Sequence, residues 1–292
     1  MELRSIKQEE YSRAKHVWEM CFEGDKGAFS DYYFQSRTSW KNVVAAFSPC
    51  GDMMGALHML PYCASFFGRE KRCALVAGVS TLERYRNQGV AAALMRFAEK
   101  RMLADGVLAA TLQPFNFEFY QKFSYSVFVQ RREYEWKGVN SERAVLNTNR
   151  IEPDRMLDIY RSFMRDQNGF SIRTEQDCRL LIEEFQTCGG MAAMLGNAYA
   201  LGERLEGGVI HIAELAGQRS DAMALINALK TGCTRVFAPW PLNREGLEGA
   251  RESHKPFNMI KILSAGAFFN DIPVKSAEQL TAEETLYAFE RY

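Results

Sequence analysis

The chain has 292 residues, of which 47% are hydrophobic and 25% are charged, a composition typical of a folded rather than a disordered protein. The 36 basic residues equal the 36 acidic residues in number, and zero net charge argues against a nucleic-acid partner held mainly through its phosphates. Because the length exceeds the roughly 100–200 residues of a typical domain, we expect two domains.

The N-terminus lacks the apolar core of a secretory signal, and no apolar run reaches the roughly 18 residues that a membrane span needs. We therefore expect a cytoplasmic protein without a membrane partner. The seven cysteines are odd in number and include no C-x-x-C pair. This spacing favours reduced thiols over disulfides, and we expect no metal site.

Strand and helix patterns alternate through the first half of the chain. A short strand over residues 2–6 precedes an amphipathic helix over 8–23. The following patterns predict, in chain order, an antiparallel meander of strands over 43–47, 53–67 and 72–81, a helix over 89–104, a buried strand over 107–112, a short helix over 117–123 and a strand over 125–136.

The second half repeats this order in blurred form. Its predicted elements are helices over 153–167, 174–188 and 220–231, strands over 191–195, 198–201, 208–215, 235–238 and 257–263, and a polar tail of helical character from Ala282. A shared order of α/β units indicates an ancient duplication. We predict one domain over 1–138, a connector over 139–150 and a second domain over 151–292.

The segment from Gly78 to Leu94 is the most informative for chemistry. A strand leads through a loop into a helix that opens at Gly89, where the missing β-carbon lets a phosphate approach the backbone. The unpaired N–H groups of a helix N-terminus hold anions, and Arg84 and Arg86 add charge beside it. The design suits a diphosphate. The sequence contains neither G-x-x-x-x-G-K-[ST] nor G-x-G-x-x-G, which argues against a P-loop or a dinucleotide fold.

The pattern Arg86-x-x-Gly89-x-Ala91, between a strand and an Ala-rich helix, resembles the acetyl-CoA signature of the GCN5-related N-acetyltransferases (GNAT). The resemblance implies that the strand pairs with pantetheine through its backbone, and that the loop and the first helical turn bind the diphosphate of acetyl-CoA. The expected cofactor-binding residues are Val79, Ser80, Thr81, Arg84, Arg86, Asn87, Gln88, Gly89, Val90, Ala91 and Ala92.

The later segment from Phe119 to Tyr125 resembles the family's F-Y-x-K-x-G-F, with Ser124 in place of the glycine. Tyr120 falls on the family's tyrosine, which stands near the thioester sulfur and protonates the departing thiolate. The resemblance therefore implies a catalytic role for Tyr120.

The whole arrangement most resembles the enhanced-intracellular-survival branch of the family. That branch pairs a GNAT domain with a second, degenerate one and adds a sterol-carrier-like domain. The resemblance covers about residues 1–265, and the stretch after Leu263 is too short for the third domain. A C-terminal carboxylate takes part in catalysis in that branch, which makes the carboxylate of Tyr292 a second catalytic candidate.

The resemblance implies an α/β (α+β) fold of two GNAT-like mixed-sheet domains in tandem, and an acetyl-CoA-dependent N-acetyltransferase. The expected acceptor is a primary amine, on a small molecule or a lysine, that attacks the thioester directly. Several candidates for the base stay open: Glu118, His58, Glu83, the Tyr292 carboxylate and water.

Acidic and aromatic residues cluster after the first helix, and family topology puts this region on the acceptor side. They suit a cationic acceptor, and they are equally consistent with a solvated loop beside core aromatics. The residues concerned are Glu23, Asp25, Asp31, Tyr32, Tyr33 and Phe34.

The second half lacks the coenzyme signature. Its nearest equivalent, residues 215–222, has one glycine, and Asp221 in the first helical turn repels a phosphate. We interpret this half as non-catalytic packing or as a scaffold for the acceptor site. A non-catalytic acyl-CoA-binding or sensor protein is the alternative function, and homo-oligomerisation stays open.

Overall fold

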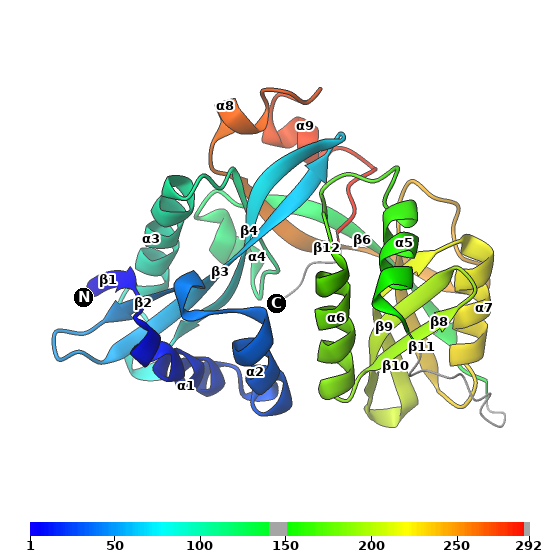
Figure 1. Cartoon of the computed structure of the whole chain (residues 1–292), viewed down its shortest axis with the longest axis horizontal. Helices are drawn as coiled ribbons and strands as arrows, with labels where there is room; N and C mark the ends of the chain where they lie inside the picture. The colour runs from blue at the N-terminus through cyan, green and yellow to red at the C-terminus, as the bar shows by residue number, and fades with distance from the viewer. Residues whose placement is uncertain (140–150, 289–292) are drawn as a thin grey trace. The chain divides into compact units, whose positions relative to one another are not determined.

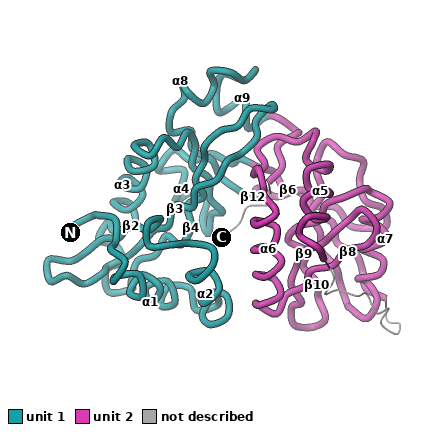
Figure 2. Tube along the Cα trace, viewed as in Figure 1, with its two compact units in different colours: residues 1–128, 257–282, 290–292 teal, residues 129–256, 283–289 magenta. Residues whose placement is uncertain are grey.

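The computed structural model describes residues 1–139 and 151–288, so most of the predicted connector, together with Tyr292, lies outside the described residues. This part of the chain forms two compact units (Figures 1 and 2). Unit 1 holds residues 1–128 and 257–282, and unit 2 holds the remaining described residues up to 256 and from 283.

Neither unit is continuous in sequence, because two strands run from one unit into the other. Strand β6 (Ser126–Lys137) begins in unit 1 and ends in unit 2, whereas β12 (Arg251–Ile262) begins in unit 2 and ends in unit 1. The compact units therefore differ in extent from the continuous segments 1–138 and 151–292 that the sequence predicts.

Unit 1 is a mixed sheet with a hydrophobic core on each face. Its strands lie in the order β1 (Glu2–Ser5), β2 (Val43–Phe47), β3 (Met53–Phe66), β4 (Arg69–Thr81), β5 (Ala109–Leu112) and the end of β12. Neighbouring strands are antiparallel except β4 and β5, which are parallel. The predicted meander of β2, β3 and β4 is confirmed.

The helices of unit 1 are mostly short. They are α1 (Tyr11–Cys21), α2 (Ala28–Tyr32), α3 (Val90–Ala104), α4 (Phe117–Gln121), α8 (Ala265–Phe268) and α9 (Ala277–Thr281). A π-helical turn, Tyr33–Arg37, extends α2.

Strand β2 shows how the two cores are divided. All five of its residues are buried. Val43, Ala45 and Phe47 pack with the core that contains α1, and Val44 and Ala46 pack with the core that contains α3. Because side chains alternate across a strand, a continuous apolar run needs cover on both faces.

A β-bulge interrupts the pairing of β3 with β4. Ala56 pairs with Ser80 and His58 pairs with Ala77, so two residues of β4 oppose one of β3. Gly78 lies in the bulge with φ of +57°, and a β-carbon there would stand 2.1 Å from the Trp18 ring. Only glycine fits both the backbone conformation and the close approach of the indole.

His58 lies in an aromatic cluster on the α1 side of the sheet. It is 1% exposed, and its Nδ1 lies 3.0 Å from the hydroxyl of Tyr33. The rings of Trp18, Tyr33 and Phe34 surround it at centroid distances of 5.2–5.5 Å. Burial lowers the pKa of His58 to about 3, so the ring is neutral at physiological pH.

Unit 2 repeats the organisation of unit 1. Its strands lie in the order β6, β11 (Arg235–Trp240), β10 (Val209–Gly217), β9 (Ala198–Leu205) and β8 (Met191–Leu195). Helices α5 (Pro153–Phe163), α6 (Glu175–Thr187) and α7 (Arg219–Leu229) pack against this sheet in one core. A further two-residue strand, β7 (Phe170–Ser171), follows α5.

A buried ion pair lies inside the core of unit 2. The guanidinium of Arg173 donates to both carboxylate oxygens of Glu214, at 2.6 and 2.9 Å, and stacks 4.1 Å from the Tyr160 ring. The hydroxyl of Tyr199 donates to the same carboxylate. Such a pair tolerates the loss of neither partner, because the other charge would remain buried alone.

Several sequence predictions differ from the structure. Strand β12 begins at Arg251 rather than at residue 257, and α5 ends at Phe163 rather than at 167. The helical tail predicted from Ala282 is wrong over the described part, where Leu286 forms a β-bridge to Asn168. These segments are polar or short, so their structure depends on tertiary contacts rather than on hydrophobic periodicity.

All seven cysteines are free thiols. No helix within residues 1–139 and 151–288 is long and apolar enough to cross a membrane. Over the same ranges, no group of three His, Cys, Asp or Glu side chains is arranged to hold a metal ion.

Replacing Gly78 by Ala is expected to reduce the free energy of unfolding by about 2–4 kcal/mol, because overpacking against Trp18 adds to backbone strain. Gly68→Ala is the matched control, since Gly68 also has a positive φ (+73°) but no atom within 4 Å of the place where its β-carbon would stand. Urea denaturation measures both variants. Equal losses would show that the contact with Trp18 has no energetic weight.

Acid should destabilise the protein partly through His58. Its folded pKa of about 3 lies below the unfolded value of about 6.5, so the unfolded state binds the extra proton between these values. This contribution is complete above pH 6.5 and falls by up to about 1.4 kcal/mol per pH unit on acidification. Denaturation of wild type and His58→Asn at pH 7, 6, 5 and 4 should show a shallower decline in the variant, whereas parallel curves would contradict the assignment.

Candidate functional site

Strands β4 and β5 separate partway along their length. Parallel pairing joins residues 73–75 to 109–111, and in the described part of the chain β4 then continues to Thr81 alongside β3 alone. The free edge of β4 therefore presents backbone N–H and C=O groups from Val76 to Thr81. These include Val79, Ser80 and Thr81, the residues that the resemblance assigns to pantetheine.

The connection from β4 to α3 follows this free edge directly. A 3₁₀ turn, Glu83–Tyr85, leads to Asn87 and Gly89, which both have positive φ, of 63° and 76°. The helix begins at Val90, and the first helical bond runs from the N–H of Ala93 to the carbonyl of Gly89 at 3.0 Å. The N–H groups of residues 90–92 precede that bond, so they are available to an anion.

Space and charge at the loop both favour an anion. A β-carbon at Gly89 would have no atom within 4 Å, so the backbone there is open to approach. Arg84, Arg86 and Gln88 are exposed. Arg84 lies 3.6 Å from the Asp52 carboxylate, Arg86 Nε donates to Thr81 O at 3.4 Å, and Gln88 Nε2 donates to Arg84 O at 3.1 Å.

Two predicted cofactor residues point their side chains inward. The Ser80 hydroxyl donates to Ala56 O at 3.1 Å and accepts from Ala56 N at 3.3 Å. Val90 is 1% exposed and packs in the core beside α3. Both residues can meet a ligand only through their backbone, while Ala91 and Ala92 are half-buried on the same helical turn.

Tyr120 lies on α4 in an aromatic environment. Asn116 caps this helix by accepting the Phe119 N–H at 3.0 Å. The Tyr120 ring is 3% exposed, and it lies edge-on to Phe119 and Phe115 at 5.0 and 5.6 Å. Burial raises the pKa of its hydroxyl, so the group keeps its proton throughout the physiological range.

The acidic and aromatic residues after α1 separate into two groups. Tyr32, Tyr33 and Phe34 are buried core residues. Asp31 is exposed and pairs with Lys15. Asp25 is half-buried, where it accepts the indole N–H of Trp18 at 3.1 Å. Burial raises the Asp25 pKa, and the Trp18 hydrogen bond acts in the opposite direction. Glu23 is exposed.

The candidate bases differ in accessibility. His58 is enclosed by aromatic rings and bonded to Tyr33, which argues against direct contact with an acceptor amine. Glu83, in the connection from β4 to α3, and Glu118, on α4, are both exposed. The Tyr292 carboxylate lies outside the described residues.

Sequence reasoning missed three residues near the free edge of β4 and near Tyr120. Trp18 packs on the Gly78 bulge. The Cys21 thiol interacts with the Thr81 backbone and with Arg86, which oppose the rise in its pKa caused by burial. Phe115 is 75% exposed although it contacts Tyr120. Of these three contacts, the sequence signals only the one with Trp18, because a glycine inside a strand pattern, here Gly78, marks a bulge or the close approach of another residue.

Comparisons with known proteins agree with this geometry. Residues 2–128 match the family model of an acetyltransferase (GNAT) domain. No curated protein matches the sequence.

Solved structures share the fold at low sequence identity. A probable N-acyltransferase from Enterococcus faecalis has a TM-score of 0.75 at 15% identity, over 93% of this chain and 75% of its own. A GCN5-related N-acetyltransferase from Kribbella flavida reaches 0.69 at 17% identity, over 91% and 72% of the two chains. Eis1 from Mycobacterium abscessus reaches 0.69 at 15% identity, over 91% and 75%.

The matches extend over both units, although the family model stops at residue 128. The chain therefore has the mixed α/β fold that the sequence predicts, and it shares this fold with the solved structures over both units. Residues 2–128 thus match a GNAT acetyltransferase domain, and the whole chain shares the fold of solved GCN5-related N-acetyltransferases and of Eis1.

Proposed function

We propose that the chain transfers the acetyl group of acetyl-CoA to a primary amine, by direct attack of the amine on the thioester. The observation that carries this proposal is the free edge of β4 leading into an open helix N-terminus at Gly89. An extended backbone edge suits the amide-bearing pantetheine arm, and helix N–H groups suit a diphosphate.

Backbone groups and arginine side chains both bind acetyl-CoA in this proposal. The N–H groups from Gly89 to Ala92 face the diphosphate, while Arg84 and Arg86 supply charge from the exposed loop. The backbone from Val79 to Thr81 pairs with pantetheine, and N–H groups near the bulge polarise the thioester carbonyl.

Tyr120 acts at the leaving sulfur. A thiol has a pKa of about 8.5, and even an unperturbed tyrosine has a pKa of about 10. Complete proton transfer from tyrosine to a thiolate is therefore uphill by about 2 kcal/mol or more. Because burial raises the Tyr120 pKa further, its hydroxyl works first as a hydrogen-bond donor that stabilises developing negative charge on sulfur.

The acceptor must be a neutral amine when it attacks. An alkyl amine with a pKa of about 10.4 needs a base, or must bind in its small neutral fraction. We assign the attraction of a cationic acceptor to Asp25, which is half-buried and accepts the indole N–H of Trp18. Water, Glu83, Glu118 and the Tyr292 carboxylate remain the candidate bases.

The diphosphate assignment is tested by Gly89→Glu. A carboxylate in the mouth of the helix should weaken acetyl-CoA binding about 10–100-fold. In the wild type, acetyl-CoA at a concentration of 100 times its Kd should raise the free energy of unfolding by about 2.7 kcal/mol. Gly68→Glu is the control, because Gly68 has a similar positive φ and open surroundings in the β3–β4 turn. Thermal shift against acetyl-CoA measures both variants, and unchanged affinity in Gly89→Glu would exclude this site.

The assignment of Tyr120 is tested by Tyr120→Phe. Turnover should fall about 10²–10⁴-fold with little change in acetyl-CoA affinity, as expected for a group used mainly in the transition state. Thiol release is measured with a panel of polyamines, aminoglycosides and lysine peptides. Tyr125→Phe is the matched control, since the Tyr125 hydroxyl is buried without a hydrogen-bond partner in the described structure. Full turnover by Tyr120→Phe would remove the assignment, and binding without turnover of any amine by wild type would favour a sensor.

A further inference from the structure

Unit 2 contains the same strand divergence as unit 1. In each unit, a strand with a β-bulge leads into a helix and then into a parallel strand: β4, α3 and β5 in unit 1, and β10, α7 and β11 in unit 2. Pairing of β10 with β11 covers residues 209–211 and 235–237 and then stops, as pairing of β4 with β5 stops after residue 75. Diverging parallel strands leave space at their carboxyl ends.

The inner part of this divergence is filled in unit 2. The buried guanidinium of Arg131 donates to the carbonyls of Ile212 and Ala213, at 3.3 and 3.2 Å, beside the bulge of β10. The backbone that would correspond to the thioester site is therefore already hydrogen-bonded. A single residue, Gln218, separates β10 from α7, so no loop is present to hold a diphosphate.

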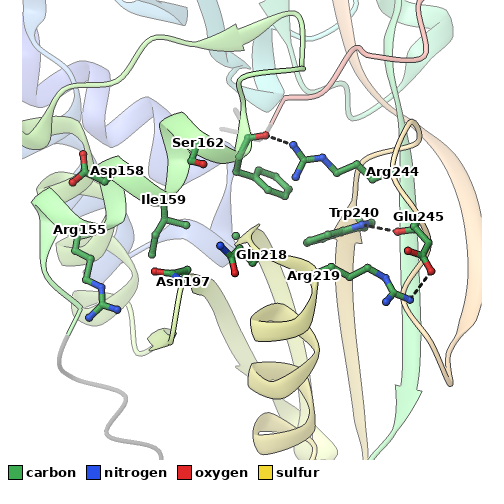
Figure 3. Close-up of a pocket in the computed structure, with 12 residues that line it drawn as sticks. Arg155, Asp158, Ile159, Ser162, Asn197, Gln218, Arg219, Trp240, Arg244 and Glu245 are labelled. Atoms are coloured by element: carbon green, nitrogen blue, oxygen red, sulfur yellow. Dashed lines mark hydrogen bonds and ion pairs between the residues drawn. The ribbon is translucent and has the colours of Figure 1, made fainter.

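The outer part remains open as a cavity of about 680 Å³ (Figure 3). One face of α5 forms a wall, from Arg155 to Phe163, and Ile159, Phe163 and Trp240 supply its apolar surface. Asn197 and Gln218 bring exposed amide groups to the opposite side. A cavity of this size is ample for a small organic molecule.

The guanidiniums of the lining differ in how they are paired. Three guanidiniums line the cavity against two carboxylates. Arg244 is held by Asp166 at 2.5 Å, and Arg219 is held by Glu248 at 2.9 Å. Arg155 donates to the Gly196 carbonyl at 2.7 Å, and it has no carboxylate within ion-pair distance in the described structure.

Arg155 therefore brings a guanidinium without an ion pair in the described structure, and with spare N–H donors, to the rim. Asp221, which the sequence predicts to repel a phosphate, accepts the Asn197 N–H at 2.7 Å and does not line the cavity. Of the two carboxylates in the lining, Glu245 lies 3.4 Å from Arg219, and Asp158, one helical turn from Arg155, is the remaining opposing charge.

We propose that this cavity is a second ligand site, for a small organic anion with one carboxylate or phosphate and an apolar body. Arg155 and the amides of Asn197 and Gln218 hold the anionic group, and Ile159, Phe163 and Trp240 contact the apolar body. The plugged bulge and the missing loop exclude a thioester coenzyme, so unit 2 keeps a binding site without the chemistry proposed for unit 1.

The experiment is calorimetric titration of the full chain with AMP, indole-3-acetate and inorganic phosphate. It is performed in the Gly89→Glu background, so that AMP binding at the proposed coenzyme site of unit 1 does not contribute. We expect saturable one-site binding of AMP, of indole-3-acetate or of both, and tighter than that of inorganic phosphate. Binding of AMP alone identifies a phosphate ligand, and binding of indole-3-acetate alone identifies a carboxylate ligand.

Exposed residues allow variants that should not disturb folding. Arg155→Glu should weaken binding at least about 10-fold, whereas Arg161→Glu, on the same helix but outside the cavity lining, should leave it unchanged. Ser162→Trp should block the cavity. Asp158→Asn should tighten binding about 2–3-fold, because it removes the opposing charge.

The proposal is overturned by any of three results. One is the absence of saturable binding of both organic probes up to millimolar concentration. Another is binding that survives both Ser162→Trp and Arg155→Glu. The third is equal weakening by Arg155→Glu and Arg161→Glu, which would indicate general surface charge. Activity in unit 1 does not enter these readouts, so failure here leaves the acetyltransferase proposal untouched.

Discussion

The contact between Trp18 and the Gly78 bulge is the constraint on which the candidate site depends. An indole ring occupies the place where any other residue would carry a β-carbon, and the bulge lets two residues of β4 oppose one of β3. Bulges bend a strand and increase its twist. Strand β4 therefore follows β3 to Thr81 after its pairing with β5 has ended, and its free edge is the surface offered to a ligand.

The same packing defines which nearby residues can reach a substrate. The ring cluster around His58 encloses a neutral imidazole, and Asp25 is fixed at its edge through the Trp18 indole. One tryptophan thus supports the bulge, covers the buried histidine and orients a carboxylate. The open helix N-terminus and Tyr120 come from elements on the other core, so the candidate site draws on both faces of one sheet.

Unit 2 has the same bulged strand and strand divergence as unit 1, but it lacks the open coenzyme site proposed there. The bulge and the strand divergence persist, but Arg131 fills the inner space and the connection to α7 shrinks to Gln218. Inside its core, the buried guanidinium of Arg173 and the buried carboxylate of Glu214 pair with each other, so neither charge is offered to a ligand. Persistent backbone geometry with altered side chains is consistent with an ancient duplication followed by divergence.

The amino-acid sequence by itself determined the elements with strong hydrophobic periodicity, such as β2 and α3, and it predicted a coenzyme-binding motif from Arg86 to Ala91, because both are local patterns. It also indicated the duplicated order. Only the tertiary structure decided that His58 is enclosed, that Trp18 meets Gly78 and that β6 and β12 each run from one unit into the other. These features join residues far apart in the chain, and local periodicity carries no information about which distant surfaces pack together.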